Sequence, residues 1–223
     1  IAAGLGHAGW AVAVHCHNSR DDAQSLVNEI AKKGGRAAVV AADLSDAADT
    51  GGLVARAAKA LGPLSLLVNN ASIFERDTAA TMTPDGFDRH MAINVRAPFL
   101  LAQAFARQVP DGRQGNIVNL IDSRVWRPKP EYTSYAVSKS ALWSLTQMLA
   151  IEMAPGVRVN AIGPGPVLPN ARQSAAHFAH QWAATPLGRG ATPEEIARAV
   201  LYLVDAPGMT GQMLALDGGE HLL

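Results

Sequence analysis

Short apolar runs rich in Val, Ile, Leu and Ala alternate with longer helical segments along most of the chain. The runs predict strands at Trp10–His17, Arg36–Ala42, Leu64–Asn69, Asn116–Ile121, Val157–Ile162 and Gln212–Leu216. Most of these are apolar on both faces, as parallel strands covered by helices on both sides must be. The intervening segments predict helices near 21–33, 46–61, 84–108, 133–153 and 193–205. This alternation predicts an α/β fold with a doubly wound parallel sheet, whose ligand sites lie beyond the carboxyl ends of the strands.

Two segments depart from this alternation. The opening "IAAGLGHAGWAVAVHCH" reads as a helix that passes into a strand and has no initiator Met, so we expect the natural protein to begin earlier. The stretch 163–192 begins "GPGPVLPN" and is expected to form a substrate loop with one short helix. The sequence shows neither an internal repeat nor a linker. We therefore predict one domain over 1–223, incomplete at its N-terminus.

The composition narrows the class of protein. Among the 223 residues, nineteen basic and nineteen acidic side chains balance, which gives no indication of a nucleic-acid or membrane-surface partner. The single Cys excludes an internal disulfide framework and is typical of a reducing compartment. The sequence contains no apolar run of transmembrane length and no signal peptide. These features predict a soluble cytoplasmic protein.

The glycines of "GLGHAG" match a dinucleotide-binding pattern but stand in the wrong context. Gly4, Gly6 and Gly9 follow G-x-G-x-x-G. That pattern binds pyrophosphate only where a strand precedes it and a helix follows it. Here a helix ends and a strand follows, so we expect these glycines to cap the helix and turn the chain.

The stretch "IDSRVWRPKPEYTSYAVSK" at 121–139 carries the candidate chemistry. Tyr135 and Lys139 lie one helical turn apart and can project into one site. A nearby ammonium favours the phenolate, so Lys139 is expected to lower the pKa of Tyr135 and to make the pair an acid/base at a carbonyl or imine. The spacing alone is weak evidence for a catalytic pair, because a surface Tyr and a solvated Lys also produce it. Asp122 stands thirteen residues before Tyr135.

Further motifs occur in order along the whole chain: "NNAS" at 69–72, Asn94 in "INVRAPF", "YAVSK" at 135–139, "VRVNAIGPGPV" at 157–167 and "TGQMLALDGG" at 210–219. Together they resemble the short-chain dehydrogenase/reductase family. The resemblance implies a Rossmann-type fold in which Tyr135 transfers a proton and Asn94 supports a proton-relay water. It also implies that Lys139 holds the nicotinamide ribose, and that a homotetramer forms through the helices 84–108 and 133–153.

Two departures from the family matter. Its glycine-rich T-G-x-x-x-G-x-G loop and first strand are absent from these residues. Asp122 stands where most members have Ser, and this aspartate resembles the one in the pteridine reductase branch. Phe74 comes shortly after "NNAS", where that branch stacks a Phe on its pterin. The resemblance thus implies a pterin-like heterocycle with a C=N bond, bound by Phe74, Asp122, Ser123 and Tyr135. Alternatively, Ser123 supplies an ordinary hydroxyl to a carbonyl, 3-oxoacyl or sugar reductase, or the chain is a non-catalytic NADP-binding sensor.

Polar and basic residues after the 10–17 strand favour NADP(H), because they accept a 2′-phosphate that an acidic residue would repel. Asp21 and Asp22 stand close behind them and leave NAD open. Asp43 resembles the family residue that contacts adenine. The predicted cofactor-binding residues are His17, Asn18, Ser19, Arg20, Asp43, Asn70, Ala71, Ser72, Tyr135, Lys139, Pro164 and Gly165.

Histidines offer a weak metal pattern. His15 and His17 flank Cys16 on one strand, and His177 and His180 are three residues apart on a predicted helix. A site needs three or four converging ligands, and no further ligand cluster is recognisable in the sequence. We therefore predict no metal. Trp126 and Trp182 either border the pocket or pack against the core.

Overall fold

The computed structural model describes residues 1–169 and 173–223, and all six predicted strands form in it with shifts of a few residues at their ends. The strands are β1 (Val12–Cys16), β2 (Ala37–Ala41), β3 (Leu66–Asn69), β4 (Gly115–Leu120), β5 (Val157–Pro164) and β6 (Met213–Leu216). The helices are α1 (Ala2–His7), α2 (Arg20–Lys32), α3 (Ala47–Leu61), α4 (Pro84–Met91), α5 (Ala97–Gln108), α6 (Thr133–Glu152), α7 (Ala175–Ala183) and α8 (Pro193–Asp205).

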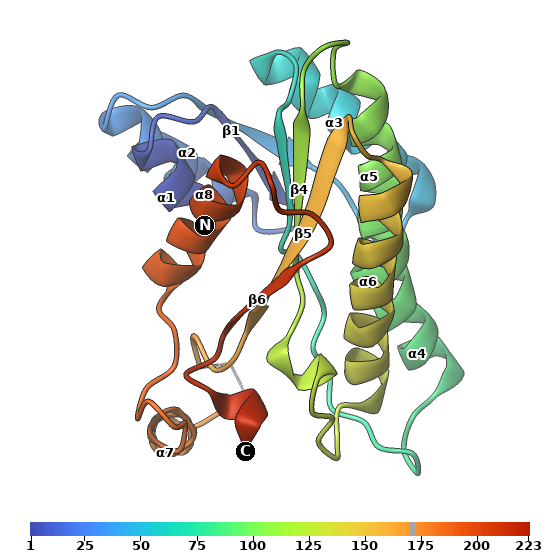
Figure 1. Ribbon diagram of the computed structural model, residues 1–223, viewed down its shortest axis with the longest axis vertical. Coiled ribbons are helices and arrows are strands. Elements are labelled where there is room, and N and C mark those ends of the chain that lie inside the picture. Colours follow the sequence, from blue (N-terminus) through green and yellow to red (C-terminus); the bar gives the residue numbers. More distant parts are fainter. Residues whose placement is uncertain (170–172) are drawn as a thin grey trace.

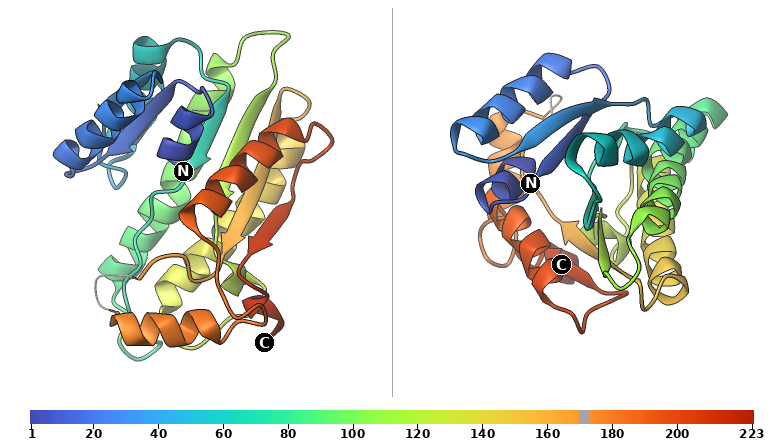
Figure 2. Two further views of the ribbon diagram at one scale, coloured as in Figure 1. Left: turned by 90° about the vertical axis from the view of Figure 1, so that its left-hand side faces the viewer. Right: turned by 90° about the horizontal axis from the view of Figure 1, so that it is seen from above.

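All strand pairs are parallel, as predicted, and they form two sheets in the order β1-β2 and β3-β4-β5-β6. Helices cover both faces (Figure 1). Helices α1, α2 and α8 lie on one side, and α3, α5 and α6 lie on the other. The view from above in Figure 2 shows the strands enclosed between these two layers. The α/β prediction is thereby confirmed.

Each helical layer has its own core. On one face, Ile30 of α2 and Val200 of α8, both fully buried, share a cluster with Val118 and Ile162 of the central strands. On the other face, Phe105 of α5 is fully buried in a cluster with Ile117 and Val159. Neighbouring positions of β4 and β5 therefore supply both cores, which explains why these strands read as continuously apolar.

Local signals account for where several helices begin and end. The Thr192 side chain accepts a hydrogen bond from the backbone of Glu195, whose own side chain bonds back to the backbone of Thr192, and Pro193 opens α8. The predicted helix 84–108 proves to be three pieces, because a π-helical turn, Ala92–Arg96, separates α4 from α5. Such turns are rare and often mark functional sites, and this one contains Asn94.

The glycines of the G-x-G-x-x-G pattern in "GLGHAG" have two distinct roles. Gly9 adopts a left-handed conformation with φ of 89° just after α1, as expected of a turn residue. Gly4 and Gly6, in contrast, lie inside α1, so the prediction that they cap it is wrong. A Cβ atom at Gly4 would approach Ala197 of α8 to 2.6 Å, and one at Gly6 would approach Ile30 of α2 to 2.8 Å. Their small size lets α1 pack closely on α2 and α8.

An apolar groove of about 580 Å³ runs between the two sheets. Val12 and Val14 of β1 line one side of it, and Leu66 and Val68 of β3 line the other. Among the described residues, no strand lies between β1 and β3.

The segment predicted as a substrate loop, 163–192, combines the end of β5, the helix α7 and irregular backbone; its residues 170–172 lie outside the described part. Within the described residues, no helix combines the length and apolar character that crossing a membrane requires.

Candidate active site

The site forms where β4 ends. After Leu120 the chain passes through Ile121 and Asp122 into a single 3₁₀ turn, η2 (Ser123–Val125). Asp122 caps this turn, because its Oδ1 accepts a hydrogen bond of 2.9 Å from the backbone N–H of Arg124. Its Oδ2 accepts a hydrogen bond of 3.0 Å from the Tyr135 hydroxyl. The structure thus joins the aspartate to the tyrosine thirteen residues away.

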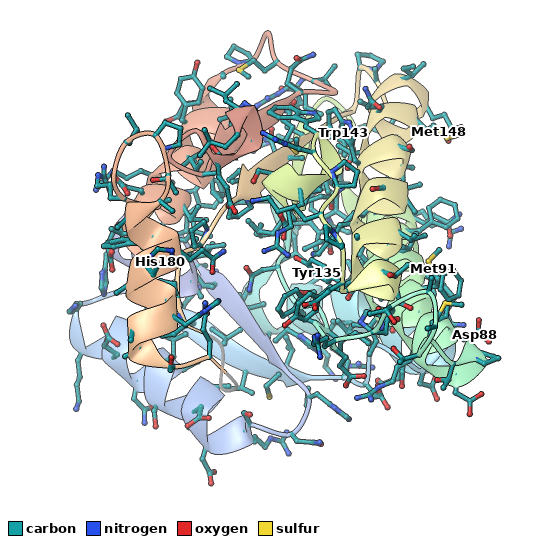
Figure 3. All side chains as sticks on the ribbon, turned by 90° about the horizontal axis from the view of Figure 1, so that it is seen from below. Asp88, Met91, Tyr135, Trp143, Met148 and His180 are labelled. Carbon is teal, nitrogen blue, oxygen red and sulfur yellow. The ribbon has the colours of Figure 1, made fainter. Side chains whose placement is uncertain are left out.

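Helix α6 carries Tyr135 and Lys139 on one face. Both are buried, with 8% and 3% of their surface exposed. The Lys139 Nζ donates a hydrogen bond of 2.8 Å to the carbonyl oxygen of Leu120, at the end of β4, and lies 5.6 Å from the centre of the Tyr135 ring. Figure 3 shows Tyr135 on the side of α6 that faces α7 and His180, away from the outer face of Met91 and Met148.

Burial shifts all three ionisable groups toward their neutral forms. It raises the pKa of Asp122 above its usual value and lowers the pKa of Lys139 to about 8. Burial also raises the pKa of Tyr135 well above 10.0, and the negative charge of Asp122 adds to the effect. The prediction that Lys139 lowers the Tyr135 pKa is therefore wrong for this structure. The ammonium lies over the ring and bonds to Leu120, whereas the carboxylate lies directly on the hydroxyl.

Asn94 is buried in the π-helical turn between α4 and α5, and its side chain is extensively bonded. The amide nitrogen donates to the carbonyl oxygen of Ile73 at 3.1 Å and to Ser138 Oγ at 2.9 Å. The amide oxygen accepts from the Ile73 N–H at 2.9 Å. Asn94 therefore fixes the loop before Phe74 against α6, and its expected support of a relay water stays a prediction.

Ser123, the first residue of η2, is buried, with 1% of its surface exposed. The Tyr135 hydroxyl donates its hydrogen bond to Asp122. The expected role of Ser123 in binding substrate stays a prediction.

Aromatic rings form one wall of the site. Phe74 packs on Tyr135 in an edge arrangement with ring centres 4.6 Å apart. Its ring also stacks on Tyr132 at 4.2 Å with an angle of 6° between the planes. Sequence reasoning missed Tyr132, although it precedes Tyr135 by three residues. Its left-handed backbone, with φ of 54° just before α6, has no local sequence signal.

Polar contacts brace this wall. Arg76 makes two hydrogen bonds to the Glu131 carboxylate, at 3.1 and 2.5 Å. The Asp77 carboxylate accepts hydrogen bonds from the backbone and hydroxyl of Ser134 at the start of α6. Sequence reasoning missed these pairs as well, because each joins residues more than fifty positions apart.

The predicted cofactor residues lie at the ends of strands. His17, Asn18, Ser19 and Arg20 are exposed after β1, where α2 begins. The His17 Nε2 atom lies 3.7 Å from the Asp43 carboxylate after β2, so these two strand ends adjoin. Asn70, Ala71 and Ser72 follow β3 and are exposed, whereas Pro164 and Gly165 at the end of β5 are partly buried.

Other candidate residues take structural positions. The indole N–H of Trp182 donates to the carbonyl oxygen of Pro166 at 3.0 Å, and Trp126 packs edge-on against His221. His15 bonds to the carbonyl oxygen of Ala42 at 3.0 Å. Over residues 1–169 and 173–223, no group of three or more His, Cys, Asp or Glu side chains is placed to hold a metal ion.

Comparison with known proteins shows extensive similarity. A solved structure of FolM alternative dihydrofolate reductase 1 from Brucella suis, in complex with NADP, matches with a TM-score of 0.97 and 43% identity over 100% of this chain and 90% of that chain. An uncharacterized oxidoreductase of Methylorubrum extorquens is 33% identical over 98% of this chain and 91% of its own length. A putative ketoacyl reductase of granaticin polyketide synthase from Streptomyces violaceoruber is 35% identical over 100% of this chain and 91% of its own length.

The model of the family described as enoyl-(acyl carrier protein) reductase matches residues 1–221, nearly the whole chain. The strand order, the Tyr135–Lys139 pair and the oxidoreductase relatives agree with this match. The chain belongs to the short-chain dehydrogenase/reductase family of oxidoreductases.

Proposed function

We propose that this protein is an NADPH-dependent reductase that transfers hydride to a C=N bond of a pterin-like heterocycle. The observation that carries the proposal is the hydrogen bond of 3.0 Å from the Tyr135 hydroxyl to Asp122. A carboxyl group at this position suits ring nitrogens better than the hydroxyl of a serine, because it can donate a proton to them when it is neutral. The likeness to FolM from Brucella suis, described as an alternative dihydrofolate reductase in complex with NADP, supports the same substrate class.

The chemistry of the donor groups fits a nicotinamide cofactor with a 2′-phosphate. The Lys139 bond to Leu120 uses one of the three N–H groups of the ammonium, and the others suit ribose hydroxyls. Exposed Asn18, Ser19 and Arg20 at the start of α2 offer hydrogen-bond donors and a positive charge to a phosphate. NADPH, when bound, supplies the hydride.

The protein's own residues would transfer the proton and orient the substrate. The Tyr135 hydroxyl donates a hydrogen bond to Asp122 in the structure, so the two groups form one acid/base unit. In the proposal, Asp122 engages the ring nitrogens and Tyr135 transfers the proton, directly or through water. Phe74 would present its ring to the flat heterocycle, and Asn94 would keep the Phe74 loop in place through its bonds to Ile73.

The test is the Asp122→Asn variant, with protein expressed from the complete reading frame. NADPH oxidation would be followed with dihydrobiopterin, dihydrofolate and simple ketones. We expect the parent to reduce the pterins and Asp122→Asn to lose roughly 10²–10⁴-fold in kcat, because an amide cannot form an acid/base pair with Tyr135 at the ring nitrogens. The matched control is Asp111→Asn in the exposed turn between α5 and β4, which should leave kcat unchanged.

The granaticin ketoacyl reductase relative keeps a second candidate function, the reduction of a carbonyl group, within the test. Turnover of ketones alone, undiminished in Asp122→Asn, would refute the pterin proposal and favour a carbonyl reductase. NADPH binding with no oxidation of any substrate would instead indicate a non-catalytic sensor.

We further propose that copies of the chain assemble through the outer faces of α4, α5 and α6. A hollow of about 460 Å³ between these helices is lined by Met91, Val95, Phe99 and Leu145, among others. Ile151 of α6, 80% exposed, extends the apolar surface. Exposed apolar side chains in a hollow that Asp88 and Arg96 also line are typical of an interface between subunits. Light scattering after size-exclusion chromatography should give the mass of a tetramer, and a monomer would contradict the proposal.

A further inference from the structure

The segment that follows β6 packs against the turn that carries the candidate catalytic acid. This C-terminal clamp, Asp217–Leu222, ends in a 3₁₀ turn, η3 (Glu220–Leu222), that contacts η2 (Figure 1). The ring of His221 meets the ring of Trp126 with centres 5.0 Å apart. Glu220, 8% exposed, pairs with Lys129 at 2.9 Å. Two contacts therefore tie the clamp to residues just beyond the turn.

The centre of the clamp is a buried carboxylate. Asp217 is 2% exposed, and its oxygens accept hydrogen bonds from the backbone N–H of Gly219 at 2.9 Å and from that of His221 at 2.9 Å. The imidazole Nδ1 of His221 adds a contact of 2.8 Å. Asp217 thus holds the η3 turn, whose His221 ring meets the ring of Trp126 at the end of η2.

The clamp reaches this position through a conformation that only glycine adopts easily. Gly218 and Gly219 both have left-handed backbones, with φ of 64° and 88°. A Cβ atom at Gly218 would lie 2.2 Å from the carbonyl oxygen of Arg189. The chain is therefore bent tightly beneath the loop that precedes α8, and the bend directs Asp217 and His221 toward η2.

The turn η2 holds the candidate acid Asp122 in place, because the Asp122 Oδ1 atom accepts a hydrogen bond from the backbone N–H of Arg124. We propose that Asp217 and His221 are positioning residues, which fix η2 from outside and so hold Asp122 against Tyr135. This inference rests on the proposed function, in which Asp122 engages the substrate. Misplacing a reacting group by about 1 Å can cost 10²-fold in rate, so a loosened turn would reduce catalysis without altering the reacting groups.

Three variants of His221 separate its contacts. His221→Ala removes both the imidazole bond to Asp217 and the contact with Trp126. His221→Asn places an amide donor near the position of Nδ1 and keeps the bond, whereas His221→Phe keeps only the aromatic contact. Leu222→Ala, in the same turn at a residue 73% exposed, is the matched control. His221 is partly exposed, and these variants are expected to fold.

The kinetic readout is the separation of kcat from KM. For whichever substrate the parent reduces, His221→Ala should lower kcat about tenfold with unchanged KM for NADPH and unchanged thermal midpoint. His221→Asn should restore most of kcat, and Leu222→Ala should match the parent. Parental kcat in His221→Ala, or a loss that merely follows a lower thermal midpoint and is not rescued by Asn, would overturn the inference.

A second readout needs no turnover and so tests the clamp separately from the proposed function. The Asp122 carboxyl can be titrated by carbon NMR, with its signal assigned through Asp122→Asn. In His221→Ala we expect its raised pKa to move back toward the ordinary value, because a loosened turn admits water. An identical titration in parent and variant would refute the positioning role, even if the parent reduces no pterin.

Discussion

Lys139 provides a quantitative test of the site's electrostatics. Its ammonium is 3% exposed, and burial lowers its pKa from 10.5 to about 8. The charged form is thus disfavoured in the folded protein relative to the unfolded chain. Lys139→Met removes the charge and keeps an unbranched apolar side chain of similar length. We expect this variant to lose activity, because the ribose-holding ammonium is gone, and to become more stable near neutral pH.

The magnitude follows from the shift in pKa. A fall from 10.5 to about 8 corresponds to roughly 3 kcal/mol, at ~1.4 kcal/mol per pKa unit. Between these two pH values the unfolded chain binds more protons than the folded protein, so the parent's stability from this group rises with pH. Below about pH 8 the full penalty remains. The variant also leaves the Leu120 carbonyl without its donor, which costs about 1–3 kcal/mol at every pH.

The assay is urea denaturation of the parent and of Lys139→Met across the alkaline range. At neutral pH the variant should be more stable than the parent by up to about 2 kcal/mol. As the pH rises to about 10.5, the parent should gain roughly 3 kcal/mol relative to the variant. Titrating groups that do not interact with Lys139 are common to both proteins and cancel in the difference, whereas Asp122 loses the attraction of the ammonium in the variant. Lys59→Met, at an exposed position in the last turn of α3, is the control.

A difference that is the same at every pH would refute the reasoning. It would mean that the Lys139 ammonium is solvated in the folded protein, and that the hydrogen bond to Leu120 alone sets the effect of the substitution.

Three further predictions follow from particular contacts. Tyr135→Phe should reduce kcat by roughly 10²–10⁴-fold in the NADPH oxidation assay, because the proton donor is removed. Arg158→Met should lower the free energy of unfolding by roughly 3–5 kcal/mol by urea denaturation, because four carbonyl oxygens around the end of α8 lose the guanidinium as a donor and, of these, Met209 keeps its bond from Asn160. Phe105→Ala, at a fully buried position, should cost about 3–5 kcal/mol in the same measurement. An undiminished kcat in the first variant, or unfolding midpoints equal to the parent's in the other two, would contradict these accounts.

The fold was largely predictable because local signals and burial agree along this chain. The strands from Val12 to Leu216 are short apolar runs, and capping residues begin several of the helices between them, such as Asp46 before α3 and Thr192 before α8. The break in the predicted helix 84–108 was not predictable, since the π-helical turn around Asn94 depends on contacts with Ile73 and Ser138. The single domain over 1–223 stays a prediction.

The site was predictable as a set of residues but not as an electrostatic environment. The residue spacing and the family resemblance predicted that Asp122, Tyr135 and Lys139 share one site, and the structure places the first two in direct contact. The direction of the Tyr135 pKa shift could not be read from spacing, because it depends on burial and on which group touches the hydroxyl. Asp217 and His221 were missed for a similar reason, since their contact with η2 joins segments far apart in the sequence.

The three pKa shifts together suggest why an aspartate suits this position. Burial raises the pKa values of Asp122 and Tyr135 and lowers the pKa of Lys139, so the site favours groups without charge; the hydrogen bond and charge of Arg124, the Tyr135 hydrogen bond and the attraction between Asp122 and Lys139 only partly oppose this. A flat heterocycle packed against Phe74 would exclude more water and raise the Asp122 pKa further. A neutral carboxylic acid can then donate to a ring nitrogen, which the hydroxyl of a serine does far less readily. Substrate binding would in this way let Asp122 bind the ring nitrogen while Tyr135 transfers the proton that the reduction of a C=N bond requires.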